Sequence, residues 1–459
     1  MTRTTTCNTR LIARQHQQPS YSNEELASLV ESKRVHRDVY LDPEIFELEM
    51  ERIWGKAWVF VGHESQVKKP GDFISTTIGK EPVLMVRDKQ GTVNVIYNRC
   101  GHKGAKVMAK PCGNTAMFRC PYHGWTFQLD GKLNATPHKC GYDDTGLDPT
   151  DPQYSMQPVA RVESHRGFVF ASLSRSGDDL KTFMGAALET IDNMADRSPK
   201  GEVEVVGACL PYFHDCNWKM FFENLNDAQH PMVCHASVGF ATRKTVKQLP
   251  QGAPVPKEVE IISPFGSSYE LFDDMGVTVM DNGHSFMGGK HSIHSAYSQI
   301  PGYMDAMIAA HGKEKSEKVL GSNRHNTAIY PSFTIKDAVQ IIRVVRPVAV
   351  DKTLIQTWHF RLKGAPEEML HRTMTYSRLI NSPASMVGPD DWDCYARMQE
   401  SLHSNSAEWV DMRRYIGQEE SHNGVTHSKG TSDLSMRNQY KAWENYMTQA
   451  QTSAQETNQ

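Results

Sequence analysis

The chain has 459 residues, and its 50 lysine and arginine residues nearly balance 53 aspartate and glutamate residues, for a formal net charge of −3. This balance excludes the strong basic excess of a dedicated nucleic-acid binder. The composition, 39% hydrophobic and 22% charged, contains no apolar run near the ~18 to 20 residues of a membrane helix. The polar first residues lack a signal-peptide core, so we expect a soluble protein of the cytoplasm, without membrane or nucleic-acid partners.

The cysteines number nine, an odd count scattered over a long chain. This distribution excludes a disulfide framework of the kind that small secreted domains use. The length, at about 150 residues per domain, predicts two or three domains.

A first helix is predicted after residue 42, because Asp42-Pro43 supplies an N-cap followed by proline at the first helical position. Apolar residues recur on one face until Gly55 ends the pattern. Residues 1–40 show no such periodicity.

Short β-rich runs then follow, at 58–62, 82–88, 92–97, 117–120, 125–129 and 167–173. Gln90-Gly91 and Asp130-Gly131 separate two pairs of them at positions where hairpins need a positive φ. This pattern predicts a small antiparallel β domain.

Helix and strand patterns mix in the remainder of the chain, from 174 onward. Strands are predicted at 202–207, 328–335, 339–348 and 353–360, and helices at 183–196, 216–230, 365–380 and 390–416. This succession favours an α+β domain in which helices cover one face of an antiparallel sheet. The stretch 262–320 is predicted to be a loop-rich cover over a pocket, and the last dozen residues are predicted to fray.

A first group of possible metal ligands lies in the β domain, where Cys100-Gly-His102 and Cys120-Pro-Tyr-His123 form two arms. Two cysteines and two histidines admit a zinc site or a [2Fe–2S] cluster in which the histidines hold one iron. Structural zinc sites usually take their ligands as a pair of cysteines and a pair of histidines along the chain. Each arm here instead holds one cysteine and one histidine, so the spacing favours an iron–sulfur cluster. Unrelated core cysteines and surface histidines would require four coincidences in a short segment.

A second group contains Asp227, His230 and His235. Asp227 and His230 are three residues apart, which would place them on one face of a helix. His235 would point away from that face on an ideal helix, so we expect Pro231 to kink or end the helix and bring His235 back.

Two imidazoles and one carboxylate with open coordination positions form the facial triad of non-heme Fe(II) oxygenases. The carboxylate could be Asp227 or a member of the Pro389-Asp390-Asp391 segment. Ordinary helix capping explains Asp390 and Asp391 equally well. Two histidines at this spacing are weak evidence alone, but a cluster that delivers single electrons requires an acceptor.

These motifs resemble the large (α) subunit of the Rieske non-heme iron aromatic ring-hydroxylating oxygenases. The resemblance extends over segments 42–54, 58–71, 100–102, 120–125, 217–219, 223–235, 389–399 and 430–447. It implies an antiparallel Rieske [2Fe–2S] domain at 56–174 and a helix-grip, START-like catalytic domain at 175–447. Residues 1–55 would pack with the catalytic domain, and 448–459 would form a flexible tail.

The resemblance also implies roles for individual residues. Those matching Cys100, His102, Cys120 and His123 bind the cluster, those matching His230, His235 and Asp391 bind a mononuclear Fe(II), and the one matching Asp227 bridges the centres. A trimer is implied in which the cluster of one subunit faces the iron of the next, alone or as a hexamer with a small β subunit. Gly101, Lys103 and Ala228-Gln229 depart from the common pattern of the family.

The implied reaction adds dioxygen to an aromatic ring, giving a cis-dihydrodiol, or a phenol if one oxygen is transferred. No dinucleotide fingerprint follows a predicted strand, so NADH is expected to act through a separate reductase, with a ferredoxin. The nearest alternative is a Rieske monooxygenase that removes O- or N-methyl groups. A pure electron carrier and a structural zinc protein are more distant alternatives.

The segments around 389–399 and 430–447 are most similar to relatives that act on aromatic carboxylates. Arg324, Arg343 and Arg346 are candidates for a carboxylate clamp, although surface or sheet-edge positions would also explain them.

Overall fold

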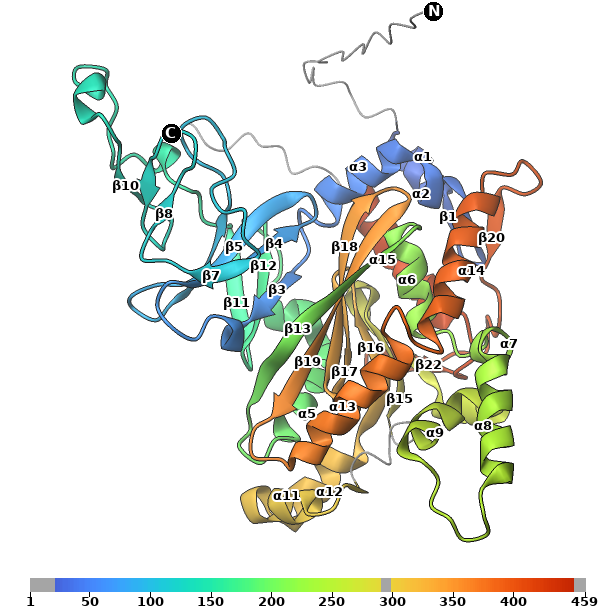
Figure 1. Cartoon of the computed structure of the whole chain (residues 1–459). Helices are drawn as coiled ribbons and strands as arrows, with labels where there is room; N and C mark the ends of the chain where they lie inside the picture. Colours follow the sequence, from blue (N-terminus) through green and yellow to red (C-terminus); the bar gives the residue numbers. More distant parts are fainter. Residues whose placement is uncertain (1–20, 290–298, 450–459) are drawn as a thin grey trace, which may run out of the picture.

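The computed structural model describes residues 21–289 and 299–449 (Figure 1). Within these ranges, no helix is both long and apolar enough to cross a membrane. Most of the predicted tail lies outside the described residues, although Thr448 still closes the last helix, α15 (Leu434–Thr448).

The β-rich part of the chain forms three small antiparallel sheets, with strand orders β6-β5-β4-β7, β10-β9-β8 and β11-β12-β3. Their strands are β3 (Val59–His63), β4 (Asp72–Ile78), β5 (Glu81–Arg87), β6 (Val93–Tyr97), β7 (Cys112–Asn114), β8 (Phe118–Arg119), β9 (Thr126–Phe127), β10 (Leu133–Ala135), β11 (Arg161–His165) and β12 (Phe168–Ser172). All six predicted strands are confirmed, and Gly91 and Gly131 take the expected positive φ of 87° and 91°. Four further strands, β4, β7, β10 and β11, were not predicted, because they are more polar.

The larger part is built on one nine-stranded antiparallel sheet, in the order β13-β19-β18-β17-β16-β15-β14-β22-β21. Its strands are β13 (Val203–His214), β14 (Val277–Val279), β15 (Ser285–Gly289), β16 (Asn323–Ile329), β17 (Phe333–Lys336), β18 (Ile341–Ala349), β19 (Lys352–Leu362), β21 (Glu420–His422) and β22 (Val425–Ser428). The single strand predicted at 328–335 is wrong, because the chain reverses at 330–332 and pairs β16 with β17.

Helices pack around this sheet, and α13 lies against β19 (Figure 1). They are α1 (Asn23–Ser28), α2 (Asp38–Leu41), α3 (Pro43–Arg52), α4 (Leu180–Met184), α5 (Leu188–Asp196), α6 (Trp218–Leu225), α7 (Pro231–Cys234), α8 (Ala236–Gln248), α9 (Lys257–Ile262), α10 (Tyr269–Met275), α11 (Tyr303–His311), α12 (Lys313–Gly321), α13 (Glu367–Ile380), α14 (Gly388–Ser401) and α15. A short sheet joins β1 (Val30–Glu31), β2 (Arg34–His36) and β20 (Trp409–Asp411). The α+β class is therefore confirmed.

Several predicted boundaries are wrong. The helices predicted at 216–230 and 390–416 end at Leu225 and Ser401, and the one at 183–196 is broken between α4 and α5. The described residues of 262–320 contain helices and strands rather than mainly loop, and α1 precedes residue 40.

The predicted first helix, α3, joins the N-terminal segment to α6 and α15 through a buried carboxylate. Glu49 accepts hydrogen bonds from Trp218 Nε1 at 2.8 Å and Trp443 Nε1 at 2.7 Å. Its Oε1 also lies 2.5 Å from Lys219 Nζ, and both charged side chains are fully buried. Glu49 thus holds α3, α6 and α15 together. The candidate site begins directly after the end of α6.

Replacing Lys219 by methionine is expected to destabilise the fold by about 3 to 5 kcal/mol, because Glu49 would keep a buried charge without its partner. The exposed pair Lys68–Glu204, at 2.9 Å, offers a matched control. Lys68→Met should cost at most about 1 kcal/mol. Urea and thermal unfolding of both variants measure the two changes in the free energy of unfolding. Equal losses in the two variants would contradict the larger contribution that we assign to the Glu49 network.

Candidate metal centres

The two arms of the first group fold into the same turn. In each arm the cysteine N–H donates to the carbonyl five residues on, at 2.9 Å for Cys100 and 2.8 Å for Cys120. The glycine four residues on returns a hydrogen bond of 3.1 Å to the cysteine carbonyl in both arms. Gly104 and Gly124 hold φ near 73° and 72°, a conformation that other residues rarely adopt. The repeated turn presents each cysteine and its histidine toward the other arm.

The four side chains of this group meet at the tip of the β-rich part. Cys100 and Cys120 are buried, and burial together with the neighbouring Cys120 thiol raises the pKa of the Cys100 thiol. The His102 and His123 rings lie edge to face with centroids 4.7 Å apart, and His102 stacks on Trp125 at 4.6 Å. The buried Nδ1 of His102 has no hydrogen-bond partner within the described ranges. Two inner thiols and two outer imidazoles fit a Rieske cluster.

The second group lies where α6 ends and α7 begins. The predicted helix through Asp227 and His230 is wrong, because Asp227 accepts a hydrogen bond from the Gln229 backbone N–H at 2.8 Å and forms a local turn instead. Pro231 begins α7 at its first position rather than ending the preceding helix. His230 and His235 therefore flank the single turn of α7, as its N-cap and C-cap residues.

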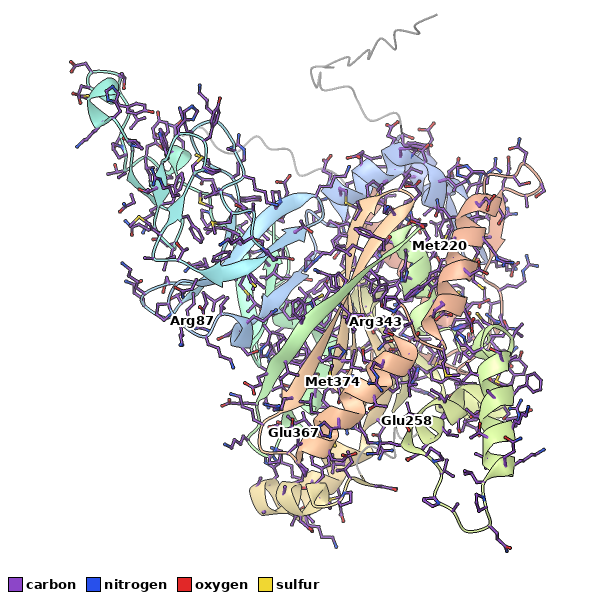
Figure 2. The ribbon with its side chains drawn as sticks, viewed as in Figure 1. Arg87, Met220, Glu258, Arg343, Glu367 and Met374 are labelled. Carbon is purple, nitrogen blue, oxygen red and sulfur yellow. The ribbon has the colours of Figure 1, made fainter. Side chains whose placement is uncertain are left out.

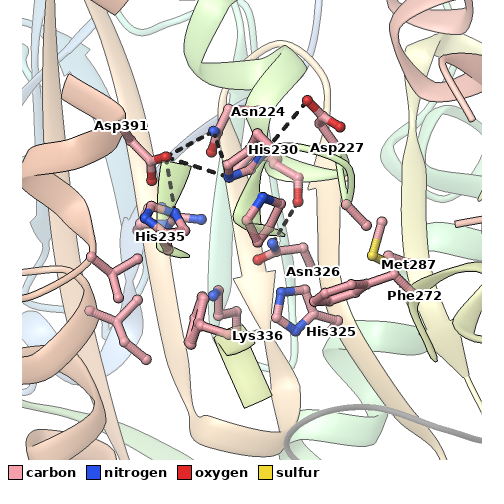
Figure 3. A pocket seen from close by; sticks show the side chains of 17 residues that line it. Asn224, Asp227, His230, His235, Phe272, Met287, His325, Asn326, Lys336 and Asp391 are labelled. Atoms are coloured by element: carbon pink, nitrogen blue, oxygen red, sulfur yellow. Dashed lines mark hydrogen bonds and ion pairs between the residues drawn. The ribbon is translucent and has the colours of Figure 1, made fainter. Parts of the chain in front are cut away.

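His230, His235 and Asp391 each offer one ligand atom, and these atoms all lie within 4.8 Å of one another. Asp391 Oδ1, from the first turn of α14, is 3.4 Å from His230 Nε2 and 3.3 Å from His235 Nε2 (Figure 3). A single ion with bonds of about 2.1 Å can span such separations. Asn224 donates a hydrogen bond of 3.3 Å to the same Asp391 oxygen. Among the described residues, no fourth side chain joins these three ligand atoms. An ion bound there would therefore keep coordination positions open for other molecules.

Two further carboxylates face the opposite nitrogens of the same rings. Asp227 Oδ2 lies 3.5 Å from His230 Nδ1, and Asp390 Oδ2 lies 3.2 Å from His235 Nδ1. A carboxylate on the outer nitrogen fixes the orientation of a ligating imidazole. The geometry thus separates the candidates that the sequence left open: Asp391 reaches the shared point, whereas Asp227 and Asp390 lie against the outer nitrogens of the two histidines.

The charges of this group stabilise one another in spite of burial. Burial raises the pKa of Asp391, but the hydrogen bond from His235 and the charge of His230 outweigh it and leave that pKa below its usual value. The same competition between burial and His230 lowers the pKa of Asp227. Both acids are therefore held as carboxylates, the form that binds a metal ion or a protonated imidazole.

A cavity opens beside the three donors, and its wall carries two cationic side chains, Lys336 from β17 and Arg343 from β18. Lys336 is only 4% exposed and lies across the cavity from Asp391 (Figure 3). Its Nζ donates to Tyr376 Oη at 2.8 Å, and the Arg343 guanidinium lies 4.9 Å from the centre of the Phe221 ring. Figure 2 shows Arg343 near the middle of the larger part of the molecule, and its side chain is half-buried. Phe265, Phe272 and Met287 supply apolar wall.

Neither cation pairs with a carboxylate among residues 21–289 and 299–449. Burial, together with the charge of Arg343, holds the pKa of Lys336 well below its usual value. An anion that enters the cavity would restore the ammonium charge and compensate both groups.

The three arginines proposed from the sequence as a carboxylate clamp lie in different places and have different partners. Arg343 lines the cavity, whereas Arg324 pairs with Glu189 at 2.8 Å and Arg346 donates to the Phe60 carbonyl at 3.0 Å. Arg346 thereby links the catalytic sheet to β3. Sequence reasoning missed Lys336, although a lysine at the end of the β-rich segment Phe333–Lys336 was a usable signal.

Comparison with known proteins agrees with this architecture. Residues 57–145 match the model of the Rieske [2Fe-2S] domain, and residues 196–448 match the ring hydroxylating alpha subunit (catalytic domain). The chain is 30% identical over 372 residues to the toluate 1,2-dioxygenase alpha subunit of Pseudomonas putida, covering 80% of this chain and 79% of that protein. It is 29% identical over 386 residues to the 2-halobenzoate 1,2-dioxygenase large subunit of Burkholderia cepacia, covering 83% and 80%.

The fold is also similar to a solved naphthalene 1,2-dioxygenase variant bound to phenanthrene, with a TM-score of 0.79, 21% identity, and coverage of 93% of this chain and 95% of that one. The chain therefore belongs to the alpha subunits of the Rieske ring-hydroxylating oxygenases. It is an aromatic ring-hydroxylating dioxygenase that carries a Rieske [2Fe–2S] cluster and a mononuclear iron and uses dioxygen as co-substrate.

The distinct positions of Asp391 and Asp390 generate a test by metal content. Asp391→Asn is expected to lower iron from about three per chain to about two, because only the mononuclear site loses a ligand while the cluster keeps its colour. Asp390→Asn should keep the third iron but weaken its affinity about 10- to 100-fold. Iron analysis during titration with a chelator distinguishes them, and equal behaviour of the two variants would contradict the assignment.

Proposed function

We propose that this chain is the terminal oxygenase component that adds dioxygen to the ring of an aromatic carboxylate. The observation that carries the proposal is that two basic side chains without a carboxylate partner at ion-pair distance in the described part of the chain, Lys336 and Arg343, line the cavity beside His230, His235 and Asp391. Relatives named for acting on 2-halobenzoate, toluate and anthranilate support the same substrate class.

In this proposal Cys100, His102, Cys120 and His123 hold the cluster, and His230, His235 and Asp391 hold the mononuclear iron. The cluster would supply single electrons, and the iron would supply the open positions at which dioxygen is activated. The proposed domains follow the same division, with the Rieske domain at 56–174 and the catalytic domain at 175–447, against which the described part of the N-terminal segment packs through α3.

The protein side chains would orient the substrate. Lys336 and Arg343 would hold its carboxylate, because an ammonium and a guanidinium on adjacent strands can each donate charge-assisted hydrogen bonds to it. The apolar residues of the wall would then pack on the ring and exclude water. Asn224 would keep Asp391 in place through its hydrogen bond. The expected product is a cis-dihydrodiol.

Electrons would pass between subunits rather than within one. Figure 1 shows β8, which leads into the Cys120 arm, and the segment around α7 on opposite sides of the molecule. Tyr122, beside His123, is 67% exposed and offers an aromatic contact next to this arm. We therefore propose a trimer in which Asp227 accepts a hydrogen bond from His123 of the partner subunit, with or without a small β subunit.

The electron donors are proposed to be a reductase that oxidises NADH and, between it and the oxygenase, a ferredoxin. NADH is a cytoplasmic reductant, which supports a cytoplasmic location for the assembly. The shared identity with large subunits of named dioxygenases supports the multicomponent arrangement.

The substrate class is tested by removing the cavity cations. Arg343→Met and Lys336→Met should each raise KM for benzoate about 10- to 100-fold, since a hydrogen bond to a charged group is worth about 1.5 to 3 kcal/mol. Turnover of toluene, which has no carboxylate, should change far less. Arg343→Lys serves as the control that keeps the charge. Equal effects on benzoate and toluene would contradict the clamp.

Transfer between subunits is tested by complementation. Cys120→Ser should remove the cluster and Asp391→Asn the mononuclear iron, so each variant alone should be inactive. Co-expressed chains form mixed trimers in which an intact cluster faces an intact iron, and activity should return. Mixed trimers, verified with two affinity tags, that stay inactive would contradict the proposal.

A further inference from the structure

Two cysteines meet beside the mononuclear iron site without forming part of it. Cys234 Sγ lies 3.7 Å from Cys394 Sγ, although the residues are far apart in the sequence. Cys394 is exposed on α14, and Cys234 is the half-buried last residue of α7. Both are free thiols in this structure.

The position of the pair connects it to the metal ligands. Cys394 follows Asp391 by three residues and so lies on the same face of α14. Cys234 directly precedes His235, and its Sγ is 4.0 Å from Asp391 Oδ1. The two sulfur atoms thus lie between α7 and α14, the two elements that supply His230, His235 and Asp391.

We propose that Cys234 and Cys394 are an oxidation site at which a hydroperoxide converts the two thiols to a disulfide that links α7 to α14. The exposed Cys394 meets the oxidant first: its sulfur takes one oxygen, the O–O bond breaks, and hydrogen peroxide leaves as water. The Cys234 sulfur then attacks the Cys394 sulfenic acid, the S–O bond breaks, and a second water leaves. Two thiols and one peroxide give one disulfide and two waters.

Formation of this bond would disturb the iron site. The two sulfur atoms must approach each other from 3.7 Å to the disulfide length of about 2.05 Å. This approach requires α7 and α14 to move closer to each other. A displacement of about 1 Å at a catalytic centre can cost about 100-fold in rate. We therefore expect oxidation to lower turnover at least about tenfold, reversibly. This effect on activity rests on the proposed iron site, whereas the disulfide itself does not.

The test uses the purified holoenzyme treated with hydrogen peroxide, alkylated and digested with trypsin. Cleavage after Lys219, Arg243, Arg378 and Arg397 yields the peptides 220–243 and 379–397, each with one cysteine. We expect mass spectrometry to find the two peptides joined, with the loss of two hydrogens. Turnover should fall in parallel and recover with dithiothreitol.

Matched variants separate the disulfide from other oxidative damage. Cys394→Ser should give no joined peptide and should keep its turnover under the same treatment. Cys112→Ser, at an exposed cysteine of the β-rich part, should behave as the wild type. Absence of the joined peptide would overturn the oxidation site, and equal inactivation of Cys394→Ser would overturn its effect on turnover. A joined peptide in a chain that never binds a third iron would instead refute the proposed function alone.

Discussion

One carboxylate oxygen, Asp391 Oδ1, lies 3.3 to 3.4 Å from the Nε2 atoms of two histidines that belong to a different element. The position of this oxygen depends on the docking of α14 against α7 and the end of α6. The Gln399 side chain of α14 accepts a hydrogen bond of 2.8 Å from the Asn217 N–H at the start of α6, and the buried Glu49 network joins α6 to α3 and α15. The fold thus fixes three donors around one point without any fourth protein ligand among the described residues.

Charge balance follows from the same constraint. Asp227, Asp390 and Asp391 gather around the imidazoles, while two basic side chains, Lys336 and Arg343, line the wall of the cavity. In the proposed function, a metal ion would compensate the acids and an anionic substrate would compensate the basic side chains.

Much of this could be predicted from the sequence. The mixed Cys-His arms indicated the cluster because ligand type and spacing are local properties, and Asp42-Pro43 fixed the start of α3 through local capping. The end of α6 could not be predicted, because the side chain of Asp227 forms a turn where the apolar pattern allowed a helix. The roles of the three acids required the docking of α14, which no local pattern encodes.

The cavity was the hardest part to predict. Lys336 and Arg343 reach it because β17 and β18 pair in one register of a long-range sheet. Arg346 lies in the same strand as Arg343 and Arg324 lies in β16, yet both contact other partners. Residue type alone therefore cannot tell a clamp arginine from one that joins two parts of the fold.

The most direct test of the central claim is turnover of benzoate under ¹⁸O₂ by the purified protein with NADH, a reductase and a ferredoxin, followed by mass spectrometry of the product. The account predicts two labelled oxygens in one cis-dihydrodiol that retains its carboxylate. One labelled oxygen would indicate a monooxygenase. NADH oxidation without labelled product from any aromatic acid, alongside turnover of neutral arenes, would contradict the assigned substrate class.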